Sequence, residues 1–265
     1  MSLTSPTEWN AAEYHRVSGP QFGWGLKVLD RVDFTGVERV IDAGCGSGRL
    51  TAELLTRWTA GTLLAVDRSA NMLQQARAHL APAFGRRVQF ARVALPAMPV
   101  AGWADLIFST ATFHWVLDHP ALFAHLFAAL RPGGRLDAQC GGGANLARAH
   151  ALATRVMATP DFAPYFAGWR GPWEFATPEV AAARLAAAGF IDIETSLEEA
   201  PTLLPDERSY RDFVTTVNFN PHLERIPDLD LKRRFIDDIV TLAAVTDPPF
   251  CLDYWRLNLR ARRPA

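Results

Sequence analysis

The chain has 265 residues, of which 49% are hydrophobic and 21% charged, a composition typical of a folded globular protein. Its formal net charge of -1 provides no broad positive field for a nucleic-acid backbone, so we expect a small-molecule ligand and no nucleic-acid partner. The three cysteines are widely spaced, the N-terminus lacks an apolar leader, and no apolar stretch approaches the roughly 20 residues of a membrane span. We therefore expect a cytoplasmic protein without disulfides, metal site or membrane contact.

Short β-branched stretches alternate with longer stretches rich in Ala, Leu and Arg, which predicts a parallel sheet covered by helices. The predicted strands span residues 38–43, 62–66, 88–93, 104–109, 135–140, 190–195 and 250–259. The predicted helices span residues 49–58, 120–130 and 177–188, and a further helix is capped by Ser69 and carries Met72, Leu73, Ala76 and Leu80 on one face. The sequence thus predicts an α/β fold with a seven-stranded, mostly parallel sheet and helices on both faces.

Two stretches late in the chain interrupt this alternation, at about residues 141–176 and 203–248. We expect a single domain over 1–265, with a core of about residues 26–140, 177–202 and 249–262 and an N-terminal segment, 1–25. Because both inserts leave the sheet late, we expect them to meet over the carboxyl ends of the strands and to form a helical lid. Extra packing without a lid function is the alternative.

The strongest local signal is the segment 40–48, VIDAGCGSG, in which an apolar strand ends in alternating glycines. Glycines let a ligand approach the backbone, and we expect the amides at the following helix start to face a carboxylate. Asp67 ends the next strand, at a distance from Gly46 where an acidic residue commonly holds ribose hydroxyls. Nicotinamide dinucleotides prefer a glycine where this chain has Arg49, but the motif alone leaves a dinucleotide and a smaller ligand open.

The segment 40–49 resembles the first motif of class I S-adenosylmethionine-dependent methyltransferases, and residues 104–109, ADLIFS, resemble their fourth-strand motif. Residues 113–119, FHWVLDH, and 130–136, LRPGGRL, are similar to the subgroup that contains trans-aconitate methyltransferase and malonyl-carrier O-methyltransferases. The resemblance is good over about residues 36–140 and carries nothing into the two inserts. It implies a Rossmann-like sheet, with an N-terminal segment that folds over the cofactor.

The resemblance also implies S-adenosylmethionine as the cofactor, with S-adenosylhomocysteine as its product. In this family the glycine turn lines the methionine part, the acidic residue after the second strand holds the ribose, and residues after the third strand face the adenine. The cofactor-binding residues implied are Tyr14, Gln21, Trp24, Asp42, Ala43, Gly44, Cys45, Gly46, Asp67, Arg68, Met72, Ala94, Leu95, Ser109, Thr110 and Trp115. Ala94 is a departure, because many relatives carry an acidic residue there.

The resemblance places His114 near the transferable methyl group, which makes it the candidate general base, with a loop-ordering role as the alternative. We expect His119 at the surface, at a helix start. Arg148 and His150 are candidates to hold an acidic substrate, and a solvated helix face is the alternative. The aromatic residues between Phe162 and Trp173 form either a substrate pocket or a small core.

We therefore predict methyl transfer from S-adenosylmethionine to a small molecule, with a carboxylate oxygen preferred on the resemblance alone. A carboxylate needs no base, whereas a phenol, an amine or a carbon acid is helped by one. A nicotinamide-dependent oxidoreductase and a non-catalytic S-adenosylmethionine-binding module are the alternatives. The sequence leaves the methyl acceptor and the oligomeric state open.

Overall fold

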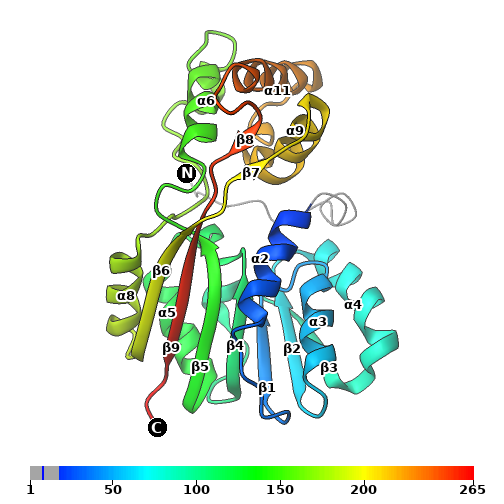
Figure 1. Cartoon of the computed structure of the whole chain (residues 1–265), viewed down its shortest axis with the longest axis vertical. Coiled ribbons are helices and arrows are strands. Elements are labelled where there is room, and N and C mark those ends of the chain that lie inside the picture. Colours follow the sequence, from blue (N-terminus) through cyan, green and yellow to red (C-terminus); the bar gives the residue numbers. More distant parts are fainter. Residues whose placement is uncertain (1–7, 9–17) are drawn as a thin grey trace.

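The computed structural model describes Glu8 and residues 18–265, and a seven-stranded sheet with the order β3-β2-β1-β4-β5-β9-β6 forms its centre (Figure 1). The first five strands pair in parallel, and β9 is inserted antiparallel between β5 and β6. The strands are β1 (Arg39–Ala43), β2 (Thr62–Asp67), β3 (Val88–Arg92), β4 (Ala104–Thr110), β5 (Leu130–Gly141), β6 (Ile191–Glu199) and β9 (Trp255–Arg262). The predicted mostly parallel α/β sheet is confirmed.

Helices cover both faces of the sheet and bury two separate cores. On one face lie α2 (Gly19–Leu29), α3 (Arg49–Arg57) and α4 (Ala70–Phe84), and on the other lie α5 (His119–Ala129) and α8 (Pro178–Ala187). Neighbouring residues of β1 point to opposite faces, so Val40 belongs to the first core and Ile41 to the second. Short turns of helix, η1 (Gly85–Arg87), η2 (Leu95–Ala97) and η3 (Phe113–Trp115), complete the connections.

Capping side chains begin several helices where the sequence predicts them. The Ser69 hydroxyl accepts the amide of Met72 at 3.2 Å, and the Thr177 hydroxyl accepts that of Val180 at 3.4 Å. The buried side chains of α4 are the predicted set, Met72, Leu73, Ala76 and Leu80. No helix in the described part of the chain is long and apolar enough to cross a membrane.

The predicted strand 250–259 is wrong as a single element. It divides into β8 (Cys251–Leu252), which pairs with β7 (Thr202–Leu203), and β9, which begins at Trp255. The break lies at Asp253, whose carboxylate accepts the amides of Arg148 and Ala149 at the start of another helix. These long-range hydrogen bonds hold Asp253 at the start of α6 (Ala147–Met157), and no local signal in the sequence announces them.

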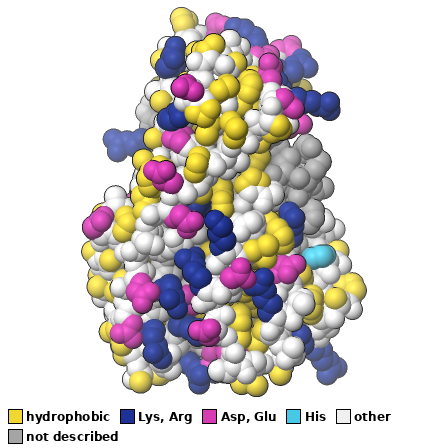
Figure 2. Space-filling model, in the orientation of Figure 1, with side chains coloured by type: hydrophobic (Ala, Val, Ile, Leu, Met, Phe, Trp, Pro, Cys, Tyr) yellow, Lys and Arg dark blue, Asp and Glu magenta, His cyan; other side chains and the backbone are white. Residues whose placement is uncertain are grey.

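The two faces of β9 differ in character. Leu257, Leu259 and Ala261 enter the core beneath α5 and α8, whereas Arg256, Asn258 and Arg260 alternate with them and face the opposite side. Near the lower end Arg260 pairs with Asp137 at 3.0 Å and with Glu194 at 3.4 Å. Figure 2 shows acidic and basic side chains interspersed over this part of the surface, as expected of a solvated face.

The two predicted inserts pack together into one helical unit, which we call the cap. It consists of α6 (Ala147–Met157), α7 (Ala163–Phe166), α9 (Glu207–Phe213), η4 (Val214–Asn218), α10 (Asn220–Leu223) and α11 (Leu229–Ala244). These helices share a third hydrophobic core, which includes Phe162, Phe166 and Phe235. The cap stands over the carboxyl ends of the parallel strands (Figure 1). A lid motion of this unit stays a prediction.

The cap core generates a stability prediction. Phe235 is fully buried and its ring lies 5.3 Å from that of Phe162 and 5.5 Å from that of Phe166, so Phe235→Ala leaves a cavity among packed aromatic rings. We expect a loss of about 3–5 kcal/mol in the free energy of unfolding, measured by urea denaturation. Val245→Ala, at a position that is 84% exposed just after α11, is the control and should change it by no more than about 0.5 kcal/mol. Equal losses in the two variants would contradict the assigned core.

Candidate functional site

The turn after β1 takes its shape from its own hydrogen bonds. The amides of Gly44 and Cys45 both donate to the carbonyl of Val66, at 2.9 and 3.0 Å. The Gly46 amide donates to Oδ2 of Asp67 at 2.9 Å, and the Gly48 amide donates to the Cys45 carbonyl at 3.0 Å. These four amides are therefore used within the protein, and the expectation that amides at the start of α3 (Arg49–Arg57) face a ligand carboxylate stays a prediction.

Gly44 and Gly46 both have a positive φ, which favours glycine, but their surroundings differ. Gly44 has φ +88°, and a Cβ there would lie 2.2 Å from the hydroxyl of Thr112, so no other residue fits. Gly46 has φ +54°, and a Cβ there would meet nothing within 4 Å. The space in front of Gly46 is therefore open, as a binding site for a flat or slender ligand part requires.

Asp67 is held rigidly at the end of β2. Its Oδ2 accepts the Gly46 amide, and its Oδ1 accepts the Ser69 amide at 2.9 Å. Burial raises the pKa of this carboxyl, and these amides work in the opposite direction. The Arg68 amide also acts on this carboxylate. A carboxylate has about four acceptor positions, so it keeps room for a hydroxyl group of a ligand.

Asp42 lies behind the turn rather than in front of it. Its Oδ2 accepts the hydroxyl of Thr51 at 2.6 Å, which joins β1 to α3. Burial raises the pKa of Asp42 to about 7, against the effect of the Thr51 hydroxyl. The side chain is 4% exposed and lines neither of the cavities described below, so its contribution is to the shape of the turn.

Two adjoining cavities open at the carboxyl ends of β1, β2 and β4. The outer groove, of about 600 Å³, runs along the residues after β3, Val93 to Pro96, and reaches Asp118. The inner pocket, of about 140 Å³, extends beneath the cap. Both cavities are lined by Gly44, Asp67, Arg68, Thr112 and Trp115. An extended ligand held at Asp67 can therefore reach into both.

Most of the cofactor residues expected from the sequence meet at these cavities. Those that line one or both are Gln21, Gly44, Gly46, Asp67, Arg68, Met72, Ala94, Leu95, Thr110 and Trp115. Those that line neither are Trp24, Asp42, Ala43, Cys45 and Ser109. Ser109 instead donates its hydroxyl to the Ala43 carbonyl at 2.6 Å, which ties β4 to β1. Tyr14 falls outside the described residues.

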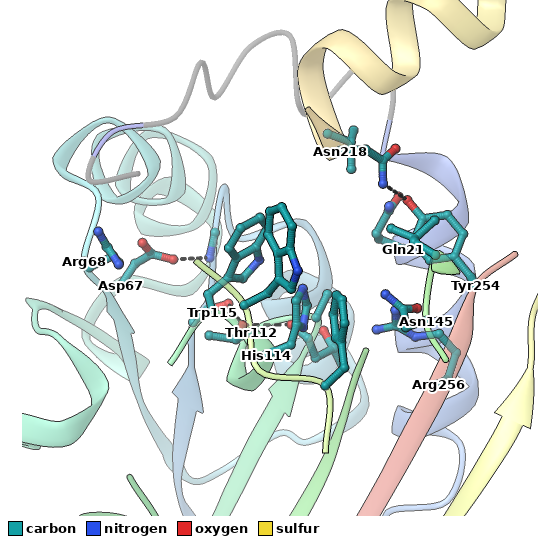
Figure 3. A pocket seen from close by; sticks show the side chains of 18 of the residues that line it. Gln21, Asp67, Arg68, Thr112, His114, Trp115, Asn145, Asn218, Tyr254 and Arg256 are labelled. Carbon is teal, nitrogen blue, oxygen red and sulfur yellow. Dashed lines mark hydrogen bonds between the residues drawn. The ribbon is translucent and has the colours of Figure 1, made fainter. Parts of the chain in front are cut away.

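His114 lies in the inner pocket, between the cofactor residues and the cap (Figure 3). Burial, followed by the charge of Arg256, holds the pKa of His114 well below its usual range, so the ring is neutral near pH 7. Its Nδ1 accepts the amide of Gly141 at 3.2 Å. A neutral imidazole carries one proton, which must then be on Nε2. His114 is thus arranged as a hydrogen-bond donor.

His119 was expected at the surface, and the structure buries it. His119 is 1% exposed rather than at the surface, because its ring bonds the Phe113 carbonyl at 3.1 Å and the Arg184 guanidinium at 3.0 Å.

His150 lines the inner pocket, and burial lowers its pKa to about 4. Arg148 is exposed and outside the pocket. The aromatic stretch is divided, since Phe162 lies in the cap core and Trp173 lines the inner pocket, and a role in substrate binding stays a prediction.

Sequence reasoning missed the part of the pocket that lies under the cap. The unassigned lining residues are Ala111, Thr112, Asn145, Leu146, Phe175, Val217, Asn218, Tyr254 and Arg256. They come from five separate parts of the chain. Asn218 donates to the Tyr254 hydroxyl at 2.8 Å, which connects the cap with the strand region (Figure 3). The sequence shows Arg256 as a charged residue in an apolar strand, but it does not show that Arg256 lines this pocket.

In the N-terminal region the structure describes Glu8 and α2, and both lie close to residues of the inner pocket. Glu8 accepts from the amides of Ala70 and Asn71, each at 3.2 Å, and so sits at the start of α4, next to Arg68. From α2, Gln21 lines the inner pocket, and the Trp24 ring lies 4.6 Å from the guanidinium carbon of Arg256. The implied covering role of this segment stays a prediction.

Comparison with known proteins gives this arrangement a context. Residues 40–134 match the family model for a methyltransferase domain. The chain is 29% identical over 235 residues to trans-aconitate 2-methyltransferase of Deinococcus radiodurans, covering 86% of this chain and 87% of that one. It is 35% identical over 160 residues to the protein of the same name from Delftia acidovorans, covering 60% of this chain and 58% of that one. The second match thus spans little more than half of its relative.

Solved structures agree on the fold. Phosphoethanolamine N-methyltransferase 2 of Haemonchus contortus, in complex with phosphomonomethylethanolamine and S-adenosylhomocysteine, superposes with a TM-score of 0.62 at 18% identity, covering 96% of this chain and 57% of that one. A putative methyltransferase from Bacillus halodurans superposes with a TM-score of 0.61 at 14% identity, and the match covers 91% of this chain and 99% of that one.

The buried Asp42 generates a prediction on pH. A carboxyl whose pKa is higher in the folded chain contributes stability that is present below its unfolded pKa, about 4, and is lost as the pH rises to about 7. Asp42→Asn carries no such charge, so its Tm relative to the wild type should rise between about pH 5 and about pH 8. Thr51→Ser keeps the hydroxyl and should show a Tm difference independent of pH. A pH-independent difference for Asp42→Asn would refute the raised pKa.

Proposed function

We propose that this chain transfers the methyl group of S-adenosylmethionine to a carboxylate oxygen of a small molecule. Its matches to the methyltransferase domain model and to trans-aconitate 2-methyltransferases support its assignment to the class I S-adenosylmethionine-dependent methyltransferases. The cofactor follows from the family, whereas the acceptor and the roles of individual residues are our proposal. The observation that carries the choice of a carboxylate is the hydrogen bond from the Gly141 amide to Nδ1 of His114.

The described residues fit an extended adenosyl amino acid. Asp67 keeps room for a ribose hydroxyl, and Gly46 leaves space in front of the turn. Ala94 and Leu95 would line the adenine, and Thr110 and Gln21 the methionine part. When bound, S-adenosylmethionine supplies a methyl group on a sulfonium: the acceptor oxygen bonds the methyl carbon, and the electron pair of the broken carbon–sulfur bond stays on sulfur.

A carboxylate suits the chemistry of His114. With its proton on Nε2 and a lowered pKa, the ring is a poor proton acceptor and a good hydrogen-bond donor to an oxygen. Carboxylates are ionised near neutral pH and lose no proton on methylation, so they need no base. Phenols and ammonium groups must lose a proton, and His114 in this arrangement does not provide for it.

The relatives lend independent support to a carboxylate acceptor. Two of them, from Deinococcus radiodurans and Delftia acidovorans, are named for trans-aconitate, a carboxylic acid. The nicotinamide-dependent alternative gains nothing from these relatives. Closure of the cap over the bound ligands and a cytoplasmic location are further expectations that this proposal includes.

Loss of the Asp67 carboxylate should weaken cofactor binding. Asp67→Ala removes acceptors for the ribose and the anchor of the Gly46 amide, so we expect the Kd for S-adenosylhomocysteine to rise by about tenfold or more in calorimetry. Asp206→Ala is the matched control, because this carboxylate also caps a helix, accepting the Ser209 amide at 2.7 Å, but lines neither cavity. An unchanged Kd for Asp67→Ala would exclude its role at the ribose.

A base-free transfer should show no ionisation of an enzymic base. With a carboxylic acid acceptor, kcat/KM should stay level from about pH 6 to about pH 9, since the acceptor is ionised throughout. The profile is measured in Asp42→Asn as well, so that titration of Asp42 near pH 7 is recognised by its disappearance in that variant. A rise near neutral pH that persists in Asp42→Asn would mean that a general base takes part.

A further inference from the structure

We propose that the acceptor is a monocarboxylate with a flat, apolar body: its charge pairs with Arg256, and its body lies among the aromatic side chains of the inner pocket. This inference rests on the proposed methylation of a carboxylate and specifies its substrate class. It differs from the tricarboxylate after which the curated relatives are named.

The charges of the inner pocket leave one place for an anion beneath the cap. Among its described lining residues the charged side chains are Asp67, Arg68 and Arg256. Asp67 and Arg68 lie together at the cofactor end, and Figure 3 shows Arg256 on the far side of His114 and Trp115. Arg256 is only 3% exposed, and its guanidinium keeps its charge in any environment. A carboxylate entering this end of the pocket therefore gains a strong, directional partner.

His114 and Arg256 are placed to act on the same carboxylate. Gly141 of β5 pairs with Arg256 of β9 in the antiparallel ladder, and the amide of Gly141 donates to Nδ1 of His114. The imidazole is thereby fixed beside the strand pair that carries the guanidinium. Its Nε2 proton is a second, uncharged donor for a carboxylate oxygen.

Beneath the cap, away from Asp67 and Arg68, additional carboxylates on the acceptor would find no further positive charge among the described lining residues. The pocket also holds the histidines His114 and His150, and burial lowers the pKa of both, that of His150 to about 4. Both rings are therefore neutral at physiological pH. A tricarboxylate would bring two further anions into a largely dry site, where an unpaired charge is strongly unfavourable.

Flat aromatic surfaces form the wall of the inner pocket around His114. The rings of Trp173 and Phe175 are stacked at 19° with centroids 6.3 Å apart, and His150 lies 4.6 Å from Trp173. Trp115 packs edge-on against Trp173, and His114 stacks on Phe175 at 5.8 Å. Leu146 and Val217 add aliphatic surface. Such a wall favours a planar apolar group by burial and by ring stacking, and it offers little to a chain of carboxylates.

Methylation would also release the product from Arg256. The acceptor loses its negative charge as the oxygen–carbon bond forms, so the pairing with the guanidinium is strongest before transfer and weak in the neutral ester. Arg256 should therefore contribute to binding of the acceptor rather than to the chemical step.

The substrate class is tested with labelled S-adenosylmethionine and a panel of acceptors: benzoate and cinnamate as flat monocarboxylates, trans-aconitate as the tricarboxylate, and methyl benzoate as the neutral control. We expect kcat/KM for at least one monocarboxylate to exceed that for trans-aconitate by about tenfold or more, with no transfer to the ester. Faster methylation of trans-aconitate overturns this inference and leaves the proposed function intact. If no carboxylate is methylated while S-adenosylhomocysteine binds, the proposed function itself is overturned.

The role of Arg256 is tested by substitution. Arg256→Gln should raise KM for the monocarboxylate by about tenfold or more and change kcat by less than about threefold, and Arg256→Lys should recover part of the binding. Both variants should keep the wild-type Kd for S-adenosylhomocysteine, which also reports a folded protein. Arg148→Gln, an exposed arginine outside the pocket, is the matched control. A loss confined to kcat, or equal KM values for wild type and both Arg256 variants, overturns the assignment.

Discussion

The hydrogen bond between the Gly46 amide and the Asp67 carboxylate fixes the geometry on which the binding site depends. It joins the turn after β1 to the end of β2, and the second oxygen of Asp67 joins both to the start of α4 through Ser69. Three elements are thereby aligned by one side chain. The desolvation of the buried carboxylate is unfavourable, and the amides of Ser69, Gly46 and Arg68 offset part of it.

This part of the molecule could be predicted because its signals are local. The strand, the alternating glycines and the helix are contiguous, and Asp67 follows at a characteristic spacing. Even here the acceptor of the Gly44 and Cys45 amides, the Val66 carbonyl, could not be predicted, because it lies on the neighbouring strand. The sequence shows that a turn needs glycines, but only the assembled sheet shows which partner each amide finds.

The inner pocket could not be predicted from the sequence because its walls meet through contacts between distant parts of the chain. Asn218 ends η4 in the cap, and Tyr254 stands 36 residues later, just before β9. Arg256 alternates with leucines on a strand, a pattern equally typical of a solvated face, and it is covered by Trp24 from the other end of the chain. His119 was misplaced for a similar reason, since Arg184 and the Phe113 carbonyl supply the bonds that permit its burial.

The position of β9 has a consequence for the order in which the protein matures. This strand follows every other strand in the sequence but lies between β5 and β6, so both of those strands keep an open edge until it has been synthesised. The same strand carries Arg256, while Asp67, at the end of β2, precedes it by 256 − 67 = 189 residues. A nascent polypeptide emerging from the ribosome would thus complete the Asp67 end of the inner pocket early and the Arg256 end only at the end of translation.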